Sequence, residues 1–302
     1  MIIGVDIGGT KTAVAGFARD DVGLRRITPV HTIPTPAREG GEAIVHAVSD
    51  AVRAVCGATP LEALGIGTAG VVGPAGAITS ATDAIHGWIG FPVRDAFMHA
   101  LGVPVSVAND VHAAAVAESA VGAGADADSV LLVAVGTGIG GAVVLHGALR
   151  RGVTGTAGSI GHTEIALPAR LAARRCPCGA SGHVEAVASG PALEQTYAEE
   201  SGVRLSLREV DAAARAGDAI AHRVITEGAQ YLGRALASVN AVLDVEAIVV
   251  GGGVAEIGES YLAEVVSAYR AAAMPGPAQA RIVPAGLGID AGLTGAAMLA
   301  AG

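Results

Sequence analysis

Residues 2–17 read Ile-Ile-Gly-Val-Asp-Ile-Gly-Gly-Thr-Lys-Thr-Ala-Val-Ala-Gly-Phe, and this stretch gives the first evidence of the fold. A β-branched run at Ile2–Asp6 leads into a glycine turn at Ile7–Thr10, and apolar character returns at Thr12–Phe17. Two short apolar runs joined by a glycine-containing turn predict a β-hairpin. The chain therefore opens with a predicted strand pair whose tip is rich in glycine.

The same pattern returns more than a hundred residues later. Val130–Val135 and Ala142–Leu145 are apolar runs on either side of the turn Gly136-Thr-Gly-Ile-Gly-Gly141. A third glycine turn, Gly251–Gly253, follows the predicted strand Ala247–Val250. Glycine turns suit phosphate groups, because backbone N–H groups without a side chain beside them can approach the oxygens closely. Each loop alone could be a structural turn, but the repetition favours phosphate binding.

Two common nucleotide-binding motifs do not explain these loops. A Walker loop places lysine after a second glycine at a fixed spacing, and Lys11, the only lysine, lacks that spacing. Residues 136–141 match the dinucleotide pattern G-x-G-x-x-G, but that pattern must open a helix. The following Ala142–Leu145 reads as a strand, which disfavours the dinucleotide interpretation. Paired hairpin tips remain, with Asp6 positioned to hold hydrated Mg²⁺.

The remaining pattern alternates strands and helices. Strands are also expected at Ile27–Ile33, Ala63–Gly67 and Pro104–Ala108, and helices at Ala43–Cys56, from Asp110 to Glu118, Ala219–Leu243 and Ala291–Ala301.

Composition narrows the class of protein. The 302 residues are 51% hydrophobic and 16% charged, which is enough apolar material for about two folded domains. A net charge of −9 without a basic cluster excludes a nucleic-acid-binding surface. The uncharged run Val130–Leu149 could span a membrane by length, but its central glycines favour a buried hairpin. Three cysteines and no signal-peptide pattern predict a cytoplasmic protein that binds neither nucleic acid nor membrane.

Asn109 and Asp110 stand where a predicted strand meets a predicted helix. In isolation this pair is most simply explained as a helix N-cap. Phosphoryl transfer to an alcohol, however, needs a carboxylate that accepts the hydroxyl proton, and Asp110 could supply it.

Taken together, these motifs resemble the ROK family of sugar kinases along the whole chain. The resemblance rests on Asp6-Ile-Gly-Gly-Thr-Lys11, Asn109–Glu118, Gly136–Gly141, Val249–Gly253 and Asp290–Ala297. It implies an α/β, two-domain actin/hexokinase-like (ribonuclease H-like) fold with an interdomain cleft. It implies an N-terminal domain of residues 1–118, completed by a C-terminal helix at 290–302, and a C-terminal domain of residues 119–289. Homodimers are common among such kinases, so we expect one here.

The resemblance also implies an ATP-dependent 6-phosphotransferase in which Asp110 is the catalytic base. ATP and Mg²⁺ are the expected cofactors, although polyphosphate remains an alternative phosphoryl donor. The expected nucleotide-binding residues are Asp6, Gly8, Gly9, Thr10, Lys11, Gly136, Thr137, Gly138, Gly140, Gly252 and Gly253. The expected sugar-binding residues are Gly70, Thr82, Asn109, Asp110, Ser159, His162 and Glu185.

Ser159 departs from the family pattern, which has a sugar-contacting glutamate at this position. A serine leaves the sugar pocket roomier and less charged at that edge. Thr82, six residues before Trp88, and the stretch Gly158–Ser189 resemble bacterial N-acetylmannosamine kinases of the family. N-acetylmannosamine is therefore the favoured sugar, with glucokinase or N-acetylglucosamine kinase as the alternatives.

The family also carries a histidine and three cysteines that bind structural Zn²⁺. Here Cys176-Pro-Cys-Gly-Ala-Ser-Gly-His183 has His183 in place of the third cysteine. Zinc accepts imidazole nitrogen as well as thiolate, so the resemblance implies a zinc site of His162, Cys176, Cys178 and His183.

Two non-enzymatic functions compete with the kinase. ROK transcriptional regulators carry an N-terminal helix-turn-helix, for which the phosphate motif at Asp6 leaves no room. A sugar-binding module without activity would have no use for a complete phosphate loop beside Asn109 and Asp110. Both are disfavoured.

Overall fold

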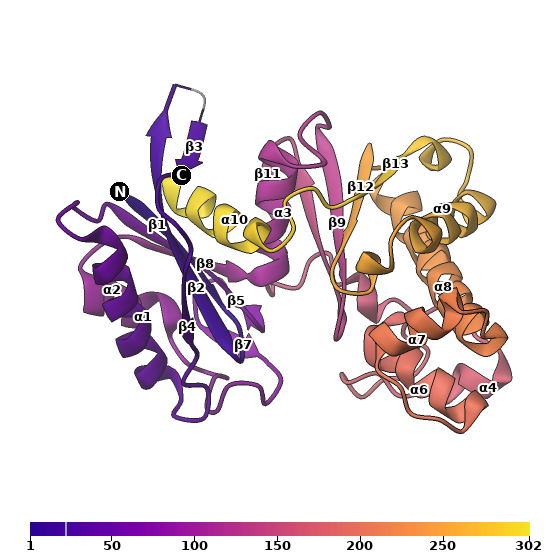
Figure 1. The fold of residues 1–302 in the computed structure, drawn as a ribbon. Helices are drawn as coiled ribbons and strands as arrows, with labels where there is room; N and C mark the ends of the chain where they lie inside the picture. Colours follow the sequence, from indigo (N-terminus) through magenta and orange to yellow (C-terminus); the bar gives the residue numbers. More distant parts are fainter. Residues whose placement is uncertain (22) are drawn as a thin grey trace. The chain divides into compact units, whose positions relative to one another are not determined.

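The computed structural model describes residues 1–21 and 23–302 and divides into two compact units, each with its own sheet. The first unit comprises Met1–Gly122, Gly147–Ala157 and Leu287–Gly302 (Figure 1). The second comprises Ala123–His146 and Gly158–Gly286. None of the helices in the described part of the chain has the length and apolar character that a membrane span requires.

The first unit is built on a six-stranded sheet with the order β3-β2-β1-β5-β8, in which β4 also pairs with β2. β1 and β2 are antiparallel, whereas β1, β5 and β8 run parallel. The elements of this unit are β1 (Ile2–Ile7), β2 (Lys11–Asp20), β3 (Gly23–Arg26), β4 (His31–Pro34), α1 (Gly41–Cys56), β5 (Ala63–Thr68), β6 (Val71–Val72), β7 (Ile78–Ser80), α2 (Val93–Leu101), β8 (Val105–Asn109), α3 (Asp110–Val121), β11 (Ala148–Arg150) and α10 (Asp290–Ala301).

The predicted opening hairpin is confirmed by the β1–β2 pair, but the strand predicted at Ile27–Ile33 is confirmed only in its last residues, which belong to β4. Two short strands, β3 and β4, flank residues 27–30 instead. Pro29 has no N–H to donate to a strand ladder, and the Thr28 hydroxyl accepts a hydrogen bond from Gly16 N at 2.8 Å. Where the chain bends between β3 and β4, the Thr28 side chain thus accepts the hydrogen bond that a strand backbone would otherwise accept.

Alternation along β1 gives the sheet two different faces. Ile3, Val5 and Ile7 are fully buried in one apolar cluster with residues of α1 such as Ile44 and Val48. Figure 1 shows α1 and α2 together on one side of this sheet and α10 on the other. Because side chains alternate along a strand, the intervening residues of β1 face α10.

Glycine dominates the face that carries α10. A Cβ atom at Gly4 would lie 2.3 Å from the carbonyl oxygen of Leu293, and one at Gly65 would lie 1.7 Å from that of Ala296. Gly4 and Gly65 are in register on neighbouring parallel strands. The helix backbone therefore rests directly on the sheet backbone, with no side chain between them.

The same helix also holds α3 against the sheet. A Cβ at Gly295 of α10 would lie 1.7 Å from the carbonyl oxygen of Ala113 on α3. At the start of α3, the Asp110 Cα lies 3.7 Å from the position that a Cβ at Gly67 would take. Gly67 is in register with Asp6 on β1. The packing of two helices on glycine strands thus brings Asp110 close to Asp6.

The second unit has strands in the order β10-β9-β12-β13, with a predominantly helical remainder. The β9–β10 hairpin and the helix predicted at Ala219–Leu243 are confirmed. The elements of this unit are β9 (Ser129–Val135), β10 (Ile139–Leu145), η1 (Ile160–His162), α4 (Ala169–Ala172), α5 (Glu185–Ala188), α6 (Gly190–Ser201), α7 (Leu207–Arg215), α8 (Ala219–Leu243), β12 (Ala247–Gly251), η2 (Ala255–Ile257), α9 (Glu259–Ala272), η3 (Pro277–Gln279) and β13 (Arg281–Pro284).

A Gly65→Ala substitution tests the contact between α10 and the sheet. The added methyl would overlap the Ala296 carbonyl, and backbone cannot swing aside as a flexible side chain can. We expect a loss of about 3 kcal/mol or more, at or above the usual cost of overpacking. Thermal and denaturant unfolding measure it.

Gly276→Ala is the matched control, since no heavy atom lies within 4 Å of the place that its added methyl would take and its φ of −66° suits alanine. Its effect should stay within about 0.5 kcal/mol. Equal stability of the two variants would contradict the close contact.

Candidate active site

Two neighbouring carboxylates, Asp6 and Asp110, mark the candidate site of the first unit. The pKa of Asp6 is raised to about 6, chiefly by burial and secondly by the nearby Asp110 charge, while Lys11 opposes the rise. Burial likewise raises the pKa of Asp110, against hydrogen bonds that include one from Val111 N to its Oδ1 at 2.8 Å. A carboxylate with a raised pKa is a stronger base than an exposed one.

Asn109 ends β8 and caps α3. Its Oδ1 accepts hydrogen bonds from Val111 N at 2.9 Å and from His112 N at 3.3 Å. Its Nδ2 donates to the Gly70 carbonyl at 3.0 Å. The pair at 109–110 is therefore a helix cap, and this role also fixes both side chains where β8 meets α3.

The first glycine turn lies between β1 and β2, just beyond Asp6. Gly8 N donates to the Lys11 carbonyl at 3.1 Å, which closes the tip. Gly9 is half-buried, whereas Thr10 and Lys11 are exposed. The predicted nucleotide-binding residues of the first unit thus form one short turn.

Gly70 and Thr82 are the two predicted sugar-binding residues of the loops around β6 and β7. Gly70 has a φ of +95°, and a Cβ there would come within 2.8 Å of the Ser80 carbonyl, so this position requires glycine. Thr82 is exposed in the loop after β7. The structure links Gly70 directly to Asn109 but shows no such link for Thr82 among the described residues.

In the second unit the glycine turns after β9 and β12 are neighbours. Gly136 N donates to the Gly138 carbonyl at 2.8 Å, and a Cβ at Gly136 would lie 4.0 Å from Gly253 N. Gly252 has a φ of +89° and packs against the backbone of Val135. Thr137 at the tip is exposed. Two loops predicted to bind nucleotide therefore meet here.

Strand β10 follows the Gly138 turn directly, and Gly140 is part of it, opposite Ala134. A dinucleotide fingerprint would have opened a helix at this point. The dinucleotide alternative is thereby excluded.

Glu185 is a buried carboxylate that ties the Gly138 turn to the cysteine-containing loop. Its Oε2 accepts a hydrogen bond from Ile139 N at 2.7 Å, and its Oε1 accepts one from Cys176 Sγ at 3.3 Å. A Cβ at Gly138 would lie only 2.7 Å from Oε2. The glycine at 138 thus makes room for this carboxylate.

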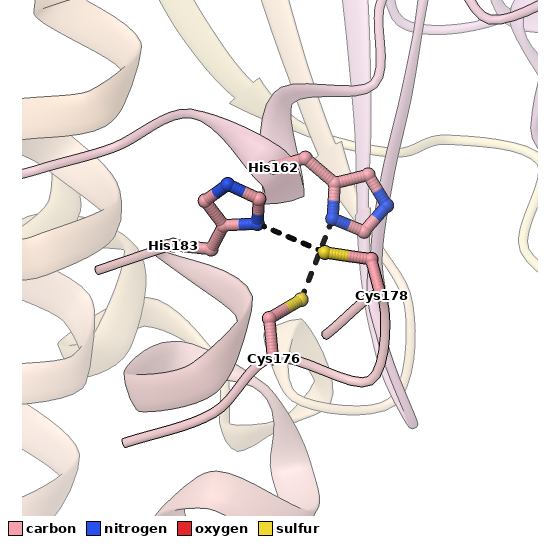
Figure 2. Close-up of side chains that lie close together, drawn as sticks. All are labelled: His162, Cys176, Cys178 and His183. Atoms are coloured by element: carbon pink, nitrogen blue, oxygen red, sulfur yellow. Dashed lines mark hydrogen bonds between the residues drawn. The ribbon is translucent and has the colours of Figure 1, made fainter. Parts of the chain in front are cut away.

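Four side chains of the second unit converge as Figure 2 shows: His162, Cys176, Cys178 and His183. One potential ligand atom from each lies within 4.8 Å of all the others. His162 Nδ1 is 3.5 Å from Cys176 Sγ, and His183 Nδ1 is 3.3 Å from Cys178 Sγ. Two sulfurs and two imidazole nitrogens at such spacing are a donor set suited to Zn²⁺.

Ser159 and His162 belong to the segment just before this cluster. His162 closes the short helix η1, and half-buried Ser159 immediately precedes it. A Cβ at Gly158 would meet the backbone of Ala142 on β10 at 2.8 Å. The segment is therefore packed closely against the second hairpin.

Sequence reasoning did not identify the residues that bring the two carboxylates together. Gly67 lies beneath Asp110, and a Cβ at Gly292 would come within 3.2 Å of Asp6 Oδ2. The alternation Gly65-Ile-Gly67 in a predicted buried strand was the available signal, because glycine within a strand marks a close approach of another backbone.

The fold and these residues define a class, the ATP-dependent sugar phosphotransferases with the actin/hexokinase-like fold. The chain belongs to the ROK family, whose model matches residues 2–302.

Three similar proteins illustrate the range of the family. N-acetylmannosamine kinase of Citrobacter koseri is 35% identical over 99% of this chain and 98% of its own. The ROK hexokinase of Thermus thermophilus is 36% identical, and its structure matches with a TM-score of 0.89 over 99% of this chain and 97% of the hexokinase chain. A ROK family glucokinase from Streptomyces griseus, solved in complex with glucose and AMPPNP, is 34% identical, with a TM-score of 0.79 over 99% of both chains.

A Gly138→Ala substitution tests the contact between the second turn and Glu185. Its methyl would lie 2.7 Å from Glu185 Oε2, so the carboxylate or the turn must move. Without ligands we expect a loss of about 1–3 kcal/mol, measured by thermal unfolding. Gly136→Ala in the same turn is the control, because its methyl meets nothing closer than 4.0 Å. Equal losses in both variants would show that Glu185 is not the cause.

Proposed function

We propose that this sugar kinase transfers the γ-phosphoryl group of ATP to the 6-hydroxyl of N-acetylmannosamine, with Asp110 as the general base. The role of Asp110 as the base is supported chiefly by its buried carboxylate. Burial raises the pKa of this group, and Asn109, which caps the same helix, fixes its position. In this role Asp110 accepts the hydroxyl proton as the sugar oxygen attacks phosphorus.

The first unit supplies the groups for the sugar and for the reacting phosphate. The Asn109 amide donates one N–H to Gly70, and its side chain also hydrogen-bonds Asp110, so Asn109 would hold the proposed base in place beside the sugar. Two adjacent carboxylates suit a divalent cation, and Asp6 would hold hydrated Mg²⁺. When bound, Mg²⁺ supplies positive charge that offsets the charge of the phosphate oxygens.

The second unit supplies the remaining groups. The adjoining turns at Gly138 and Gly253 offer backbone N–H groups to the nucleotide, and AMPPNP bound to a relative supports ATP as the donor. His162 and Glu185 would hold the sugar, with Thr82 from the first unit. We assign the two sets to domains of residues 1–118 with 290–302 and of residues 119–289. The contact-defined units differ from this division chiefly in that Gly147–Ala157 falls in the first unit.

Ser159 supports N-acetylmannosamine as the substrate. A serine in place of glutamate leaves more room and removes a charge where a sugar edge would lie. A bulky, neutral acetamido group fits such an edge better than a bare hydroxyl does. The relatives support both sugars, since an N-acetylmannosamine kinase and a glucokinase are 35% and 34% identical to this chain. Glucose is therefore the second candidate.

Two claims can be tested together, the preferred sugar and the role of Asp110 as the base. Wild type and Asp110→Asn are each assayed with glucose, N-acetylglucosamine and N-acetylmannosamine. Wild type should show its highest kcat/KM with N-acetylmannosamine. Asp110→Asn should lose about 10²–10⁴-fold in kcat with every sugar, because the amide cannot accept the proton. Its sugar affinity, measured by calorimetry, should persist.

Asp50→Asn on the exposed face of α1 is the control and should keep full activity. A far higher kcat/KM for glucose would replace N-acetylmannosamine by the glucokinase alternative. Unchanged turnover in Asp110→Asn would remove Asp110 from the mechanism.

We also propose that the four-residue cluster binds structural Zn²⁺. Its donors fit a tetrahedral site, and His183 supplies nitrogen where the family pattern has a thiolate. Bound zinc would link the η1 segment to the cysteine loop. It would bind Cys176 as a thiolate, which has no proton left to donate to Glu185 as the thiol does here.

Protein purified without chelators should contain stoichiometric zinc, and its removal should lower the melting temperature, because metal-binding free energy contributes to folding. His183→Ala should weaken zinc affinity about tenfold or more, whereas His183→Cys should retain it. His46→Ala, at an exposed histidine of α1, should leave zinc content unchanged. Zinc-free wild type of equal stability would refute the site.

A further inference from the structure

A cavity of about 260 Å³ lies within the first unit, and no residue assigned to sugar or nucleotide lines it. Its walls come from the β8 residues Val105–Val107, from the turn after β6 and from the segment around Gly152. The volume is several times the ~30 Å³ share of one water molecule. The cavity can therefore hold a small organic molecule, and it is separate from the candidate active site.

Arg151 is the first of two cations on its wall. Its Nη1 donates to the Val107 carbonyl at 3.0 Å, which holds the side chain against the edge strand β8. Across residues 1–21 and 23–302, no carboxylate forms an ion pair with it. Burial lowers the pKa of Arg151, and no neighbouring charge offsets that effect. This guanidinium is thus partly desolvated and lacks a counter-charge.

Arg94 is the second cation. Its Nε donates to Asp95 Oδ1 at 3.1 Å, but these side chains are 38% and 65% exposed, and such surface pairs are weak. The two terminal nitrogens of Arg94 have no partner in the described part of the chain. Arg94 is also the second residue of α2, whose N-terminus has no side-chain cap. The positive end of the helix dipole therefore adds to its charge.

No acidic side chain is among the described residues that line the cavity, whereas the hydroxyl-bearing Ser106 is. The chain as a whole carries a net charge of −9, so its long-range field does not attract anions. Positive charge is thus concentrated locally, and among the described residues the exposed Asp95 beside Arg94 is the only carboxylate paired with it. Such an arrangement suits an anion from solution.

We propose that this cavity is a second ligand site that binds a small phosphorylated metabolite by its phosphate group. Guanidinium groups match phosphate oxygens in charge and in hydrogen-bond geometry. A phosphate dianion can use both arginines, which a monocarboxylate cannot do equally well. The volume of about 260 Å³ leaves room for the rest of a small metabolite beside the phosphate group.

Binding of inorganic phosphate, glucose 6-phosphate and glucose is measured by calorimetry on the whole protein saturated with AMPPNP and sugar. These occupy the proposed active site, so any phosphate binding that remains reports the second site. We expect one further equivalent of phosphate or glucose 6-phosphate to bind, and glucose not to. Arg151→Gln and Arg94→Gln should each weaken this binding about tenfold or more.

Arg25→Gln is the control, because Arg25 lies on β3 and is paired with Asp20. It should bind as wild type does. Tighter binding of glucose 6-phosphate than of phosphate would identify a sugar phosphate as the ligand, and equal binding would identify phosphate itself. Absent binding in wild type, or equal binding in all four proteins, would overturn the proposal. Because two arginines are tested separately, the misfolding of one variant leaves the other informative.

Discussion

The contact between the backbone of α10 and the glycines of β1 and β5 is the constraint on which the first unit depends. Gly4 and Gly65 bring the helix so close that even a methyl group would overlap its carbonyl oxygens. Glycine buries no side chain at these positions, but the direct backbone contact fixes the distance between helix and sheet. Since α10 in turn meets α3 through Gly295, the positions of two helices follow from a few glycines.

The position of Asp110 follows from this packing. It starts α3, lies above Gly67 and shares a partly buried region with Asp6. The second unit achieves close packing in another way, since the buried Glu185 carboxylate joins the Gly138 turn to the cysteine loop. In one unit the absence of side chains positions the polar groups, and in the other a single side chain does so.

Local features were predictable and long-range contacts were not. The hairpins at residues 2–17 and 130–145 and the helix Ala219–Leu243 follow from apolar spacing and turn residues. Helix α6 was missed because its opening Gly190-Pro191 resembles a turn, although proline fits the first turn of a helix. The contact of Glu185 with Ile139, like that of Gly65 with Ala296, joins distant parts of the chain and leaves no local signal.

The place of α10 in the chain also sets an order of folding during synthesis. The glycine face of β1 and β5 forms from residues made early, but its partner helix begins only at residue 290. The ribosome makes every residue of the second unit before that helix. The nascent first unit therefore presents an uncovered sheet face throughout that interval, and it acquires its native stability only when the helix docks.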